Sequence, residues 1–512
     1  MCLSLRDNGK RDAGYQIAFQ GCAMSIVSLP FLFLFLPLSV LIYHLIPAGK
    51  NLFYRDIFLV AVSLFFYAWG EPLYVFLLLF LMLFVHIAGK MIDKKRGTAA
   101  AKVIIAVTAV LGIGVILFFR DINSWLSVLG RLIRHSFAPR PEGVPLGMAF
   151  FVFFAVSYVV DINRGKCHSP KSFLHTALYL SAFFKVTQGP IIEYHQFQSQ
   201  IENRPIDRDK IYRGTRRFLA GLAKKAIIAS SLSGIATWIF SGGSGEWSVA
   251  SAWIVCIACL VDTYIDFSAY SDMACGLALL FGFTLPENFN YPYISRSVTE
   301  YWQRWHMTLI QWFRDYLYYP ITLGPSVRFR KLLLRHGAKK KTAKILQNVF
   351  VPACVWIPTA LWHGTNLNYL LWGILNCAVC IIEMNRKPLQ RTGSKSRLGR
   401  LYTLVFLMLM MPLMLFDNIG PSLTYYGAMF GIGHPAFFDD MTLFILREYG
   451  VFILAGLLLC FPVREKIAGC LRNRLGDTAT GIIEDTALLL LSVLSVAFVI
   501  KTGSSFFIYQ MF

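Results

Sequence analysis

Long apolar runs recur along almost the whole chain, and they restrict its fold more than any other feature. A helix needs about 20 apolar residues to cross the roughly 30 Å hydrocarbon core of a bilayer. The runs include PFLFLFLPLSVLIYHLI, VIIAVTAVLGIGVILFF, NYLLWGILNCAVCII and LYTLVFLMLMMPLMLF. They lack the short alternating segments of a barrel, and no water satisfies backbone groups in that core. We therefore expect an all-α, polytopic integral membrane protein with roughly ten to twelve spans.

The charge of the chain is best interpreted as a determinant of membrane topology. The formal net charge of +21 would also suit a nucleic-acid-binding protein. However, many lysines and arginines lie in short segments between apolar runs, where the positive-inside bias places them. Three basic loops, at residues 90–102, 328–344 and 386–400, are therefore expected to be cytoplasmic. We expect membrane lipids as neighbours and no nucleic acid partner.

The two ends of the chain differ in character from the rest. Residues 1–23 are polar and lack the apolar core of a secretory signal, whereas Met24 opens an apolar run. We expect residues 1–23 to be a disordered or wrongly assigned N-terminal extension. Without internal repeats or a soluble segment longer than a loop, residues 24–512 are expected to form a single transmembrane domain.

The cysteines predict neither a disulfide framework nor a metal site. The two Cys-x-x-Cys pairs, Cys256 with Cys259 and Cys377 with Cys380, fall within predicted spans. No nearby histidine or carboxylate completes a tetrahedral ligand set for either pair. We expect all four to be buried as small apolar residues.

The segment YWQRWHMTLIQWFRDYLYYP, residues 301–320, interrupts the apolar pattern with aromatic and charged residues. A helix over residues 302–316 would place His306 on an aromatic face, opposite a polar stripe. An imidazole in such surroundings is desolvated, and therefore neutral near pH 7. This would suit catalysis or ligand binding, and equally a core histidine bonded to a backbone carbonyl. The expected polar stripe consists of Arg304, Thr308, Gln311 and Asp315.

A second histidine stands at the end of a Pro-interrupted apolar run, VFVPACVWIPTALWHG. Ionisable groups within membrane spans are costly and usually functional. The chain reaches His363 about one membrane crossing after the basic loop that ends near Lys344, so we expect it toward the outer side. His306 lies closer to the inner loops. We therefore expect the two imidazoles to approach each other from opposite sides of a pore or tunnel.

Two charged interruptions in the middle of the chain, at residues 204–225 and 286–320, are expected to be re-entrant or interfacial. Asp262, Asp266 and Asp272 are costly at membrane depth unless they are paired. We expect them to bind polar neighbours such as Arg296 or Arg304.

The two histidine segments, YWQRWHMTLIQWFRDYLYYP and ALWHG, resemble the signature segments of the membrane-bound O-acyltransferase family. The resemblance is to its bacterial branch, which O-acetylates alginate, peptidoglycan and other cell-surface polysaccharides. It extends through YIDFSAYSDMACGLALLFGFTLPENFNYPYISRS and GPIIEYHQF and covers nearly the whole chain. The ending SSFFIYQMF matches only loosely, and residues 1–23 have no counterpart in the family.

The resemblance implies about eleven membrane-spanning helices plus re-entrant or interfacial helices around a central tunnel. It implies that His363 is the principal catalytic histidine and His306 the second one. Arg304 and Arg314 are candidates to bind the phosphates of coenzyme A. The residues expected along the substrate path or tunnel are Trp302, Arg304, Trp305, Arg314, Asp315, Trp362 and Asn288.

The implied activity is transfer of an acyl group, expected to be acetyl, from a cytoplasmic thioester to a cell-surface or exported polysaccharide. The expected donor is acetyl-coenzyme A, with no permanently bound cofactor and no metal. A partner transferase outside the cytoplasm and a location in the bacterial cytoplasmic (inner) membrane are also implied. His363 would act as general base, while His306 would stabilise the oxyanion or orient the thioester.

Two other functions are kept open. One is D-alanyl transfer from a carrier protein to teichoic acid. The other is a non-enzymatic transporter or flippase, because helices with Pro and Gly breaks and buried charges are also typical of substrate pathways.

Overall fold

The computed structural model describes residues 24–47, 52–133, 136–137, 144–205, 207–240, 247–385, 397–433 and 435–502. In this part of the chain every regular element is helical, which confirms the all-α prediction. Ten of its helices are long and apolar enough to cross a membrane, in agreement with the expected number of spans. The protein is therefore a multi-pass integral membrane protein. The N-terminal residues 1–23 and most of the basic loop at 386–400 lie outside the described residues.

Most of the ten candidate spans follow the apolar runs of the sequence, and one is an addition. They are α3 (Phe53–Gly70), α4 (Tyr74–Lys94), α5 (Ala99–Arg120), Arg208–Ile235, α12 (Val249–Leu280), α17 (Lys340–His363), α18 (Leu367–Asn385), α20 (Arg397–Leu415), α22 (Asp440–Leu459) and Val463–Lys501 within α23 (Val463–Thr502). The addition is Arg208–Ile235, which begins with a charged stretch, whereas the apolar run around residues 30–46 forms only the shorter helical stretch Phe31–Leu45. The run around residues 147–160 forms a shorter helix, α7 (Met148–Arg164).

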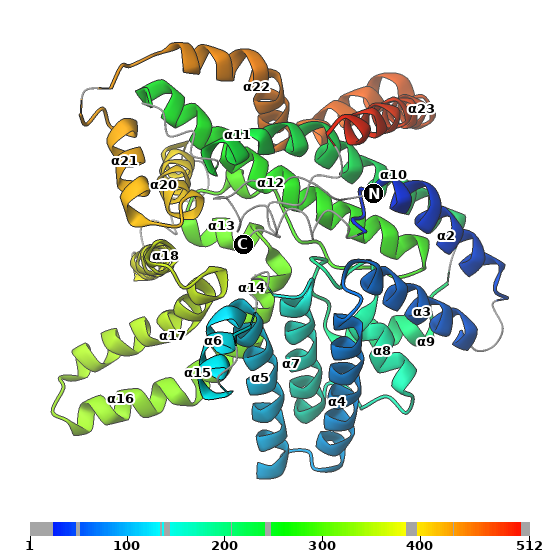
Figure 1. Cartoon of the computed structure of the whole chain (residues 1–512), viewed down its shortest axis with the longest axis vertical. Helices are drawn as coiled ribbons and strands as arrows, with labels where there is room; N and C mark the ends of the chain where they lie inside the picture. The colour runs from blue at the N-terminus through cyan, green and yellow to red at the C-terminus, as the bar shows by residue number, and fades with distance from the viewer. Residues whose placement is uncertain are drawn as a thin grey trace. The chain divides into compact units, whose positions relative to one another are not determined.

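The chain divides into two compact units. The first comprises residues 1–215 and 274–285. In it α4, α5 and α7 pack side by side (Figure 1). Glycines allow this close approach, because a Cβ at Gly89 would overlap Tyr158 and one at Gly112 would overlap Val152. The other helices of this unit are η1 (Phe31–Phe35), α2 (Leu36–Leu45), α6 (Ile122–Ile133), α8 (Phe173–Ser181) and α9 (Tyr194–Glu202).

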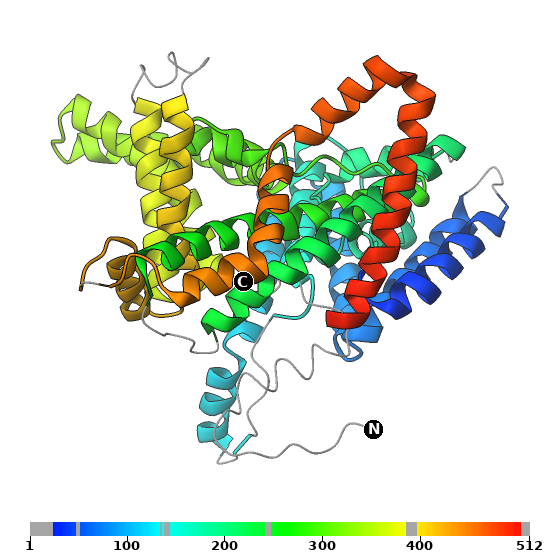
Figure 2. The same cartoon turned by 90° about the horizontal axis from the view of Figure 1, so that it is seen from above.

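The second unit comprises residues 216–273 and 286–512 and holds both candidate histidines. In it α16 (Pro325–Arg335) and α17 form a hairpin (Figure 1), and α18 and α20 run side by side (Figure 2). Close packing of α17 on α18 requires Gly373, whose Cβ would lie 2.5 Å from that of Ala360. The other elements are η2 (Lys224–Ala229), α11 (Ser230–Phe240), η3 (Pro292–Ile294), α13 (Val298–Arg304), α14 (Met307–Phe313), η4 (Arg314–Tyr318), α15 (Tyr319–Leu323) and α21 (Ile419–Met429).

Only one of the two predicted interruptions is present. Residues 286–320 form short helices, none of which is a candidate span. The interpretation of residues 204–225 as an interruption was wrong. They lead into α10 (Arg208–Ala223), and the helical stretch Arg208–Ile235 is long and apolar enough to span. Acidic partners accommodate its charges, since Arg217 lies 3.1 Å and Lys224 2.7 Å from carboxylate oxygens of Asp272.

The prediction that aspartates of α12 bind polar neighbours is confirmed for Asp266 and Asp272, but their partners are not the two arginines that were suggested. Asp266 pairs with Lys225 at 2.7 Å, and both side chains are buried. Asp272 pairs with Arg217 and Lys224, and neither aspartate pairs with Arg296 or Arg304. The reason is helical spacing, because Arg217, Lys224 and Lys225 follow one another along the helix that meets α12. By contrast, all four cysteines of the Cys-x-x-Cys pairs are buried, as predicted.

The buried pair of Lys225 and Asp266 generates a stability prediction. Replacing Lys225 with Met leaves a buried carboxylate without its cation, which costs about 3–5 kcal/mol in known cases. We expect a clearly lower thermal unfolding midpoint for the detergent-solubilised Lys225→Met protein. The double variant Lys225→Met, Asp266→Leu removes both charges and should recover most of the loss. A double variant no more stable than Lys225→Met would contradict this account.

Candidate active site

The segment that carries His306 is a broken helix. The prediction of one helix over residues 302–316 was wrong, because α13 ends at Arg304 and α14 begins at Met307. At the break His306 has φ 43° and ψ 51°, in the left-handed region. Among the described residues only Tyr291 shares a positive φ without being glycine. Such conformations are strained and often occur at functional sites.

Hydrogen bonds from an adjoining segment hold this break in place. The backbone N–H of Met307 donates to the carbonyl oxygen of Asn288 at 2.8 Å. The backbone N–H of Asn290 donates to the carbonyl oxygen of Arg304 at 3.0 Å. Residues 288–290 therefore satisfy backbone groups on both sides of His306. This compensates for the helical hydrogen bonds that the break removes.

The start of α13 is fixed by a carboxylate from α18. Glu383 accepts hydrogen bonds from the backbone N–H groups of Val298 at 2.9 Å and Thr299 at 2.8 Å. It also accepts one from the hydroxyl of Thr299 at 2.6 Å. The first N–H groups of a helix lack intrahelical partners, and a negative charge is favourable there. This contact anchors α13, and with it the aromatic residues before His306, to α18.

His306 is buried in an aromatic and polar pocket of its own. Its ring meets Phe267 edge to face, with centroids 4.8 Å apart. Its Nδ1 lies 2.9 Å from Oδ1 of Asn288. Burial, and to a smaller extent the charge of His363, lower the pKa of His306 to about 3. The imidazole is therefore neutral across the physiological pH range, as the sequence indicated.

His363 ends α17 and is half-buried among aromatic rings. The ring of His363 lies 4.9 Å from that of Trp362, 5.1 Å from Trp372 and 6.2 Å from Tyr369, measured between centroids. The helix stops at Gly364, where a Cβ would overlap the ring of Tyr369. The end of α17 and the first turn of α18 together fix the position of this imidazole.

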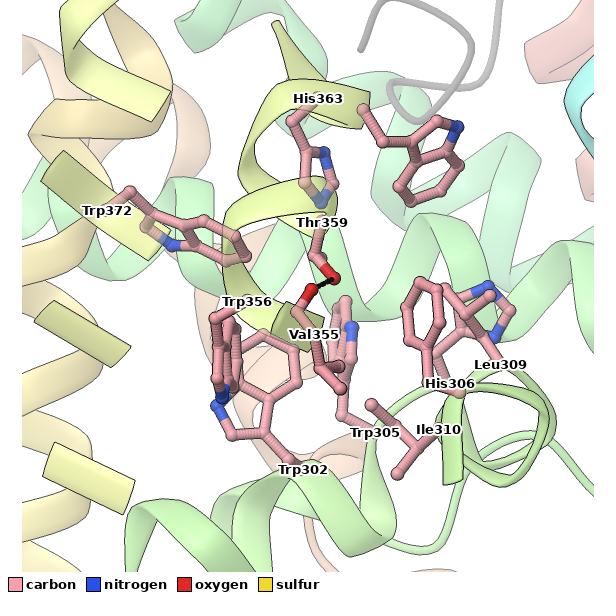
Figure 3. Close-up of a pocket in the computed structure, with 12 residues that line it drawn as sticks. Trp302, Trp305, His306, Leu309, Ile310, Val355, Trp356, Thr359, His363 and Trp372 are labelled. Atoms are coloured by element: carbon pink, nitrogen blue, oxygen red, sulfur yellow. Dashed lines mark hydrogen bonds between the residues drawn. The ribbon is translucent and has the colours of Figure 1, made fainter. Parts of the chain in front are cut away.

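Both histidines line one pocket within the second unit, with an empty volume of about 410 Å³. In Figure 3, His363 extends into it from α17, and His306 borders it from the segment between α13 and α14. Thr359, one turn before His363, donates its hydroxyl hydrogen to the carbonyl oxygen of Val355 at 2.8 Å, so its oxygen is left as an acceptor. The remaining wall is aromatic and aliphatic: Trp302, Trp305, Leu309, Ile310, Phe313, Trp356, Trp362 and Trp372.

A second, larger pocket of about 670 Å³ adjoins the first. The two pockets share Trp302, Trp305, His363 and Trp372. Its other lining residues include Met410, Met411 and Met414, which lie near the C-terminal end of α20. His363 therefore borders both spaces, whereas His306 borders only the first.

The residues predicted for the substrate path fall into three groups. Trp302, Trp305 and Trp362 line the first pocket with the two histidines. Asn288 does not line it, but contacts His306 directly. The third group lines neither pocket. It consists of Arg304, bonded to Glu300 at 2.9 Å and to the Asn290 carbonyl at 3.1 Å, and of Arg314 and Asp315, which pair with each other at 3.1 Å.

Sequence reasoning did not assign several residues of the first pocket to the site, and Trp356, Thr359 and Trp372 stand out among them. The helical period could have identified Trp356 and Thr359 from the sequence. Trp356 and Thr359 precede His363 by seven and four residues, which places all three on one face of α17. Trp372 carried no such signal, because its approach depends on how α18 packs against α17.

The pocket can support acid–base chemistry on a substrate shielded from water. Two imidazoles are held on rigid supports, and nearly all other lining groups are apolar. In such surroundings hydrogen bonds and charges act more strongly than in water. The site therefore suits proton transfer to or from a hydroxyl or thiol.

Comparison with known proteins identifies relatives of this chain. Residues 146–419, which include both histidines, match the family described as MBOAT, membrane-bound O-acyltransferase family. The chain is 32% identical over 412 residues to the probable alginate O-acetylase AlgI of Azotobacter vinelandii, a match covering 79% of this chain and 77% of that protein. It is 27% identical to the peptidoglycan O-acetyltransferase of Helicobacter pylori, over 68% of each chain. The teichoic acid D-alanyltransferase of Bacillus subtilis is 24% identical, over 47% of this chain and 60% of that protein.

The tight turn after His363 generates a prediction about the site. A Gly364→Ala variant places a methyl group inside the ring of Tyr369. Tyr369 or the end of α17 must then move, and His363 moves with it. Because a displacement of about 1 Å can cost on the order of 100-fold in rate, we expect a loss of that size in turnover by the purified protein. Gly420→Ala is the control, since nothing lies within 4 Å of a Cβ there. Equal activity of the two variants would contradict the prediction.

Proposed function

Because the chain belongs to the membrane-bound O-acyltransferase family, we propose that it moves acetyl groups from acetyl-coenzyme A toward a cell-surface or exported polysaccharide. The observation that carries the proposal is the meeting of His306 and His363 in one largely apolar pocket. The similarity to an alginate O-acetylase and a peptidoglycan O-acetyltransferase supports acetyl as the transferred group. A bacterial cytoplasmic membrane is the proposed location.

His363 is the proposed general base. The pKa of an acceptor hydroxyl is far too high for the group to attack a thioester unaided at neutral pH. His363 removes the hydroxyl proton as the oxygen bonds to the acetyl carbon, the carbon–sulfur bond breaks, and the proton passes to the departing thiolate. The products are an O-acetyl ester and free coenzyme A. His363 suits this role because it is only half-buried and borders both pockets.

The aromatic wall of the first pocket is proposed to exclude water from the thioester. Water entering the pocket would hydrolyse the thioester without acetylating the acceptor. Trp302, Trp305 and Trp362 leave little polar surface for water to bind. Exclusion of water also strengthens the electrostatic interactions that stabilise the transition state.

A separate extracytoplasmic transferase is the proposed recipient of the acetyl group, or the protein that completes its transfer. The acyl thioester and the polysaccharide are then handled at different sides of the membrane. Arg304 and Arg314 are less suited to bind phosphates of coenzyme A at this pocket, because neither lines it.

The proposal predicts that His363→Ala abolishes acetyl transfer while the protein stays folded. Loss of a general base typically costs about 100- to 10,000-fold in rate. The measurement uses purified protein in lipid vesicles and follows the transfer of radiolabelled acetyl from acetyl-coenzyme A to an acetylated glycan, together with the release of free coenzyme A. His336→Ala is the matched control, because His336 is exposed at the end of α16. Retained transfer by His363→Ala with normal thermal unfolding would refute the proposed base.

The same preparation distinguishes the two alternatives. Similarity to a teichoic acid D-alanyltransferase is the observation that favours the first, D-alanyl transfer from a carrier protein. We expect the protein to transfer labelled acetyl from acetyl-coenzyme A and not D-alanine from a charged carrier protein. If it transferred only D-alanine, D-alanyl transfer would become the proposed function. A transporter or flippase would still move its substrate after His363→Ala.

A further inference from the structure

The orientation of the Asn288 side-chain amide is determined by its neighbours. Its Oδ1 accepts a hydrogen bond from the backbone N–H of Thr308 at 3.3 Å and one from the Thr308 hydroxyl at 2.9 Å. Its Nδ2 donates to the hydroxyl oxygen of Ser271 at 3.1 Å. A backbone N–H can only donate, so the atom that faces it must be the oxygen. The amide therefore cannot be turned over without losing these bonds.

This orientation determines the tautomer of His306. Nδ1 of His306 lies 2.9 Å from the same Oδ1 of Asn288, which can only accept. Nδ1 must therefore carry the hydrogen. A neutral imidazole has one N–H, so Nε2 holds a lone pair and is an acceptor. Because Nδ1 bonds to Asn288, Nε2 is the ring nitrogen with which His306, a residue of the pocket wall, can accept a hydrogen bond from a substrate.

We propose that Asn288 is a positioning residue that holds His306 as a hydrogen-bond acceptor toward the substrate, so that His306 is not the donor to the oxyanion. The inference rests on the proposed acyl transfer and deepens it. His306 binds an N–H or O–H group of the bound substrate other than the reacting hydroxyl, whose hydrogen goes to His363. Such donors include an amide N–H beside the thioester and a neighbouring sugar hydroxyl.

The backbone geometry supports the same role for Asn288. Its carbonyl oxygen accepts from the N–H of Met307, the residue after His306. Asn288 thus holds both the strained backbone and the ring of His306, from a segment 18 residues earlier in the chain. A histidine that only filled space would need neither contact. Two contacts from one residue fix the position and the direction of the Nε2 lone pair together.

The division of labour between the histidines follows from their charges. A proton on His363 disfavours a second proton on His306, and burial disfavours it further. His306 therefore remains neutral while His363 takes up the proton during acyl transfer. His363 is the titratable group on the facing helix that influences His306, and Asn288, Ser271 and Thr308 carry no charge.

Three variants test the proposal on the full-length protein in lipid vesicles. Asn288→Leu removes the acceptor for Nδ1–H, and we expect the rate to fall on the order of 100-fold. Asn288→Asp keeps an acceptor oxygen and should recover much of the rate at alkaline pH. Ser271→Ala removes only the far contact of Asn288 and should stay within a few-fold of the unmodified protein. If Asn288→Leu is as active as Ser271→Ala, with equal thermal unfolding midpoints, the proposal is overturned.

The pH profile separates positioning from a purely structural role. In the unmodified protein His306 should contribute no acid limb above pH 5, because its pKa is about 3. A carboxylate at position 288 stabilises the protonated ring and so raises the pKa of His306. The Asn288→Asp variant should therefore lose activity as the pH falls, starting at a higher pH than the unmodified protein. Identical acid limbs in the two proteins would contradict the assigned role.

A spectroscopic measurement tests the tautomer independently of activity. Nitrogen-15 NMR of histidine-labelled protein in lipid, with the His306 signals identified by their loss in His306→Gln, distinguishes Nδ1–H from Nε2–H rings. We expect Nδ1–H, and an Nε2–H ring would overturn the inference even if acyl transfer were intact. Conversely, an Nδ1–H ring in a protein without acyltransferase activity would count against the proposed function and leave the tautomer established.

Discussion

The site depends on one constraint, which is that backbone polar groups shielded from water need partners within the protein. A break in a helix exposes such groups, and the break between α13 and α14 lies where His306 needs its unusual backbone. Asn288 and Asn290 provide the partners on its two sides. Glu383 does the same for the start of α13. The strained position of His306 is therefore possible because two other segments, residues 288–290 and α18, provide partners for backbone groups of the broken helix.

The chemistry follows from this backbone arrangement. A continuous helix would have placed Trp302, Trp305 and His306 by the helical period alone. In the broken helix Trp302, Trp305 and His306 still line one pocket together. His363 reaches the same space from the end of α17, where Gly364 stops the helix. Two imidazoles thus meet although 57 positions separate them in the chain, because each stands at a helix end and not in a helix middle.

The sequence predicted the membrane class, the helical fold and the two histidines, because these depend on local patterns. Apolar length predicts a span with little regard to neighbours, and each family segment is a short continuous stretch around its own histidine. The broken helix could not be predicted in this way. The periodicity of residues 302–316 is helical, and the break is stabilised by hydrogen bonds from residues 288–290, whose approach depends on tertiary structure. The partners of Asp266 and Asp272 failed for the same reason, since a helix first interpreted as a charged interruption supplies Lys225, Lys224 and Arg217.

One helix touches both halves of the site. Along α18, Tyr369 and Trp372 pack against the ring of His363, Asn376 accepts the indole hydrogen of Trp302, and Glu383 holds the start of α13. These four residues recur at intervals of three, four and seven, so they share one side of the helix. A slide or tilt of α18 within the bilayer must therefore pull on both imidazoles at once. The distance between the two catalytic candidates therefore depends on the position of α18. Forces that the surrounding lipid exerts on α18 are transmitted to the site.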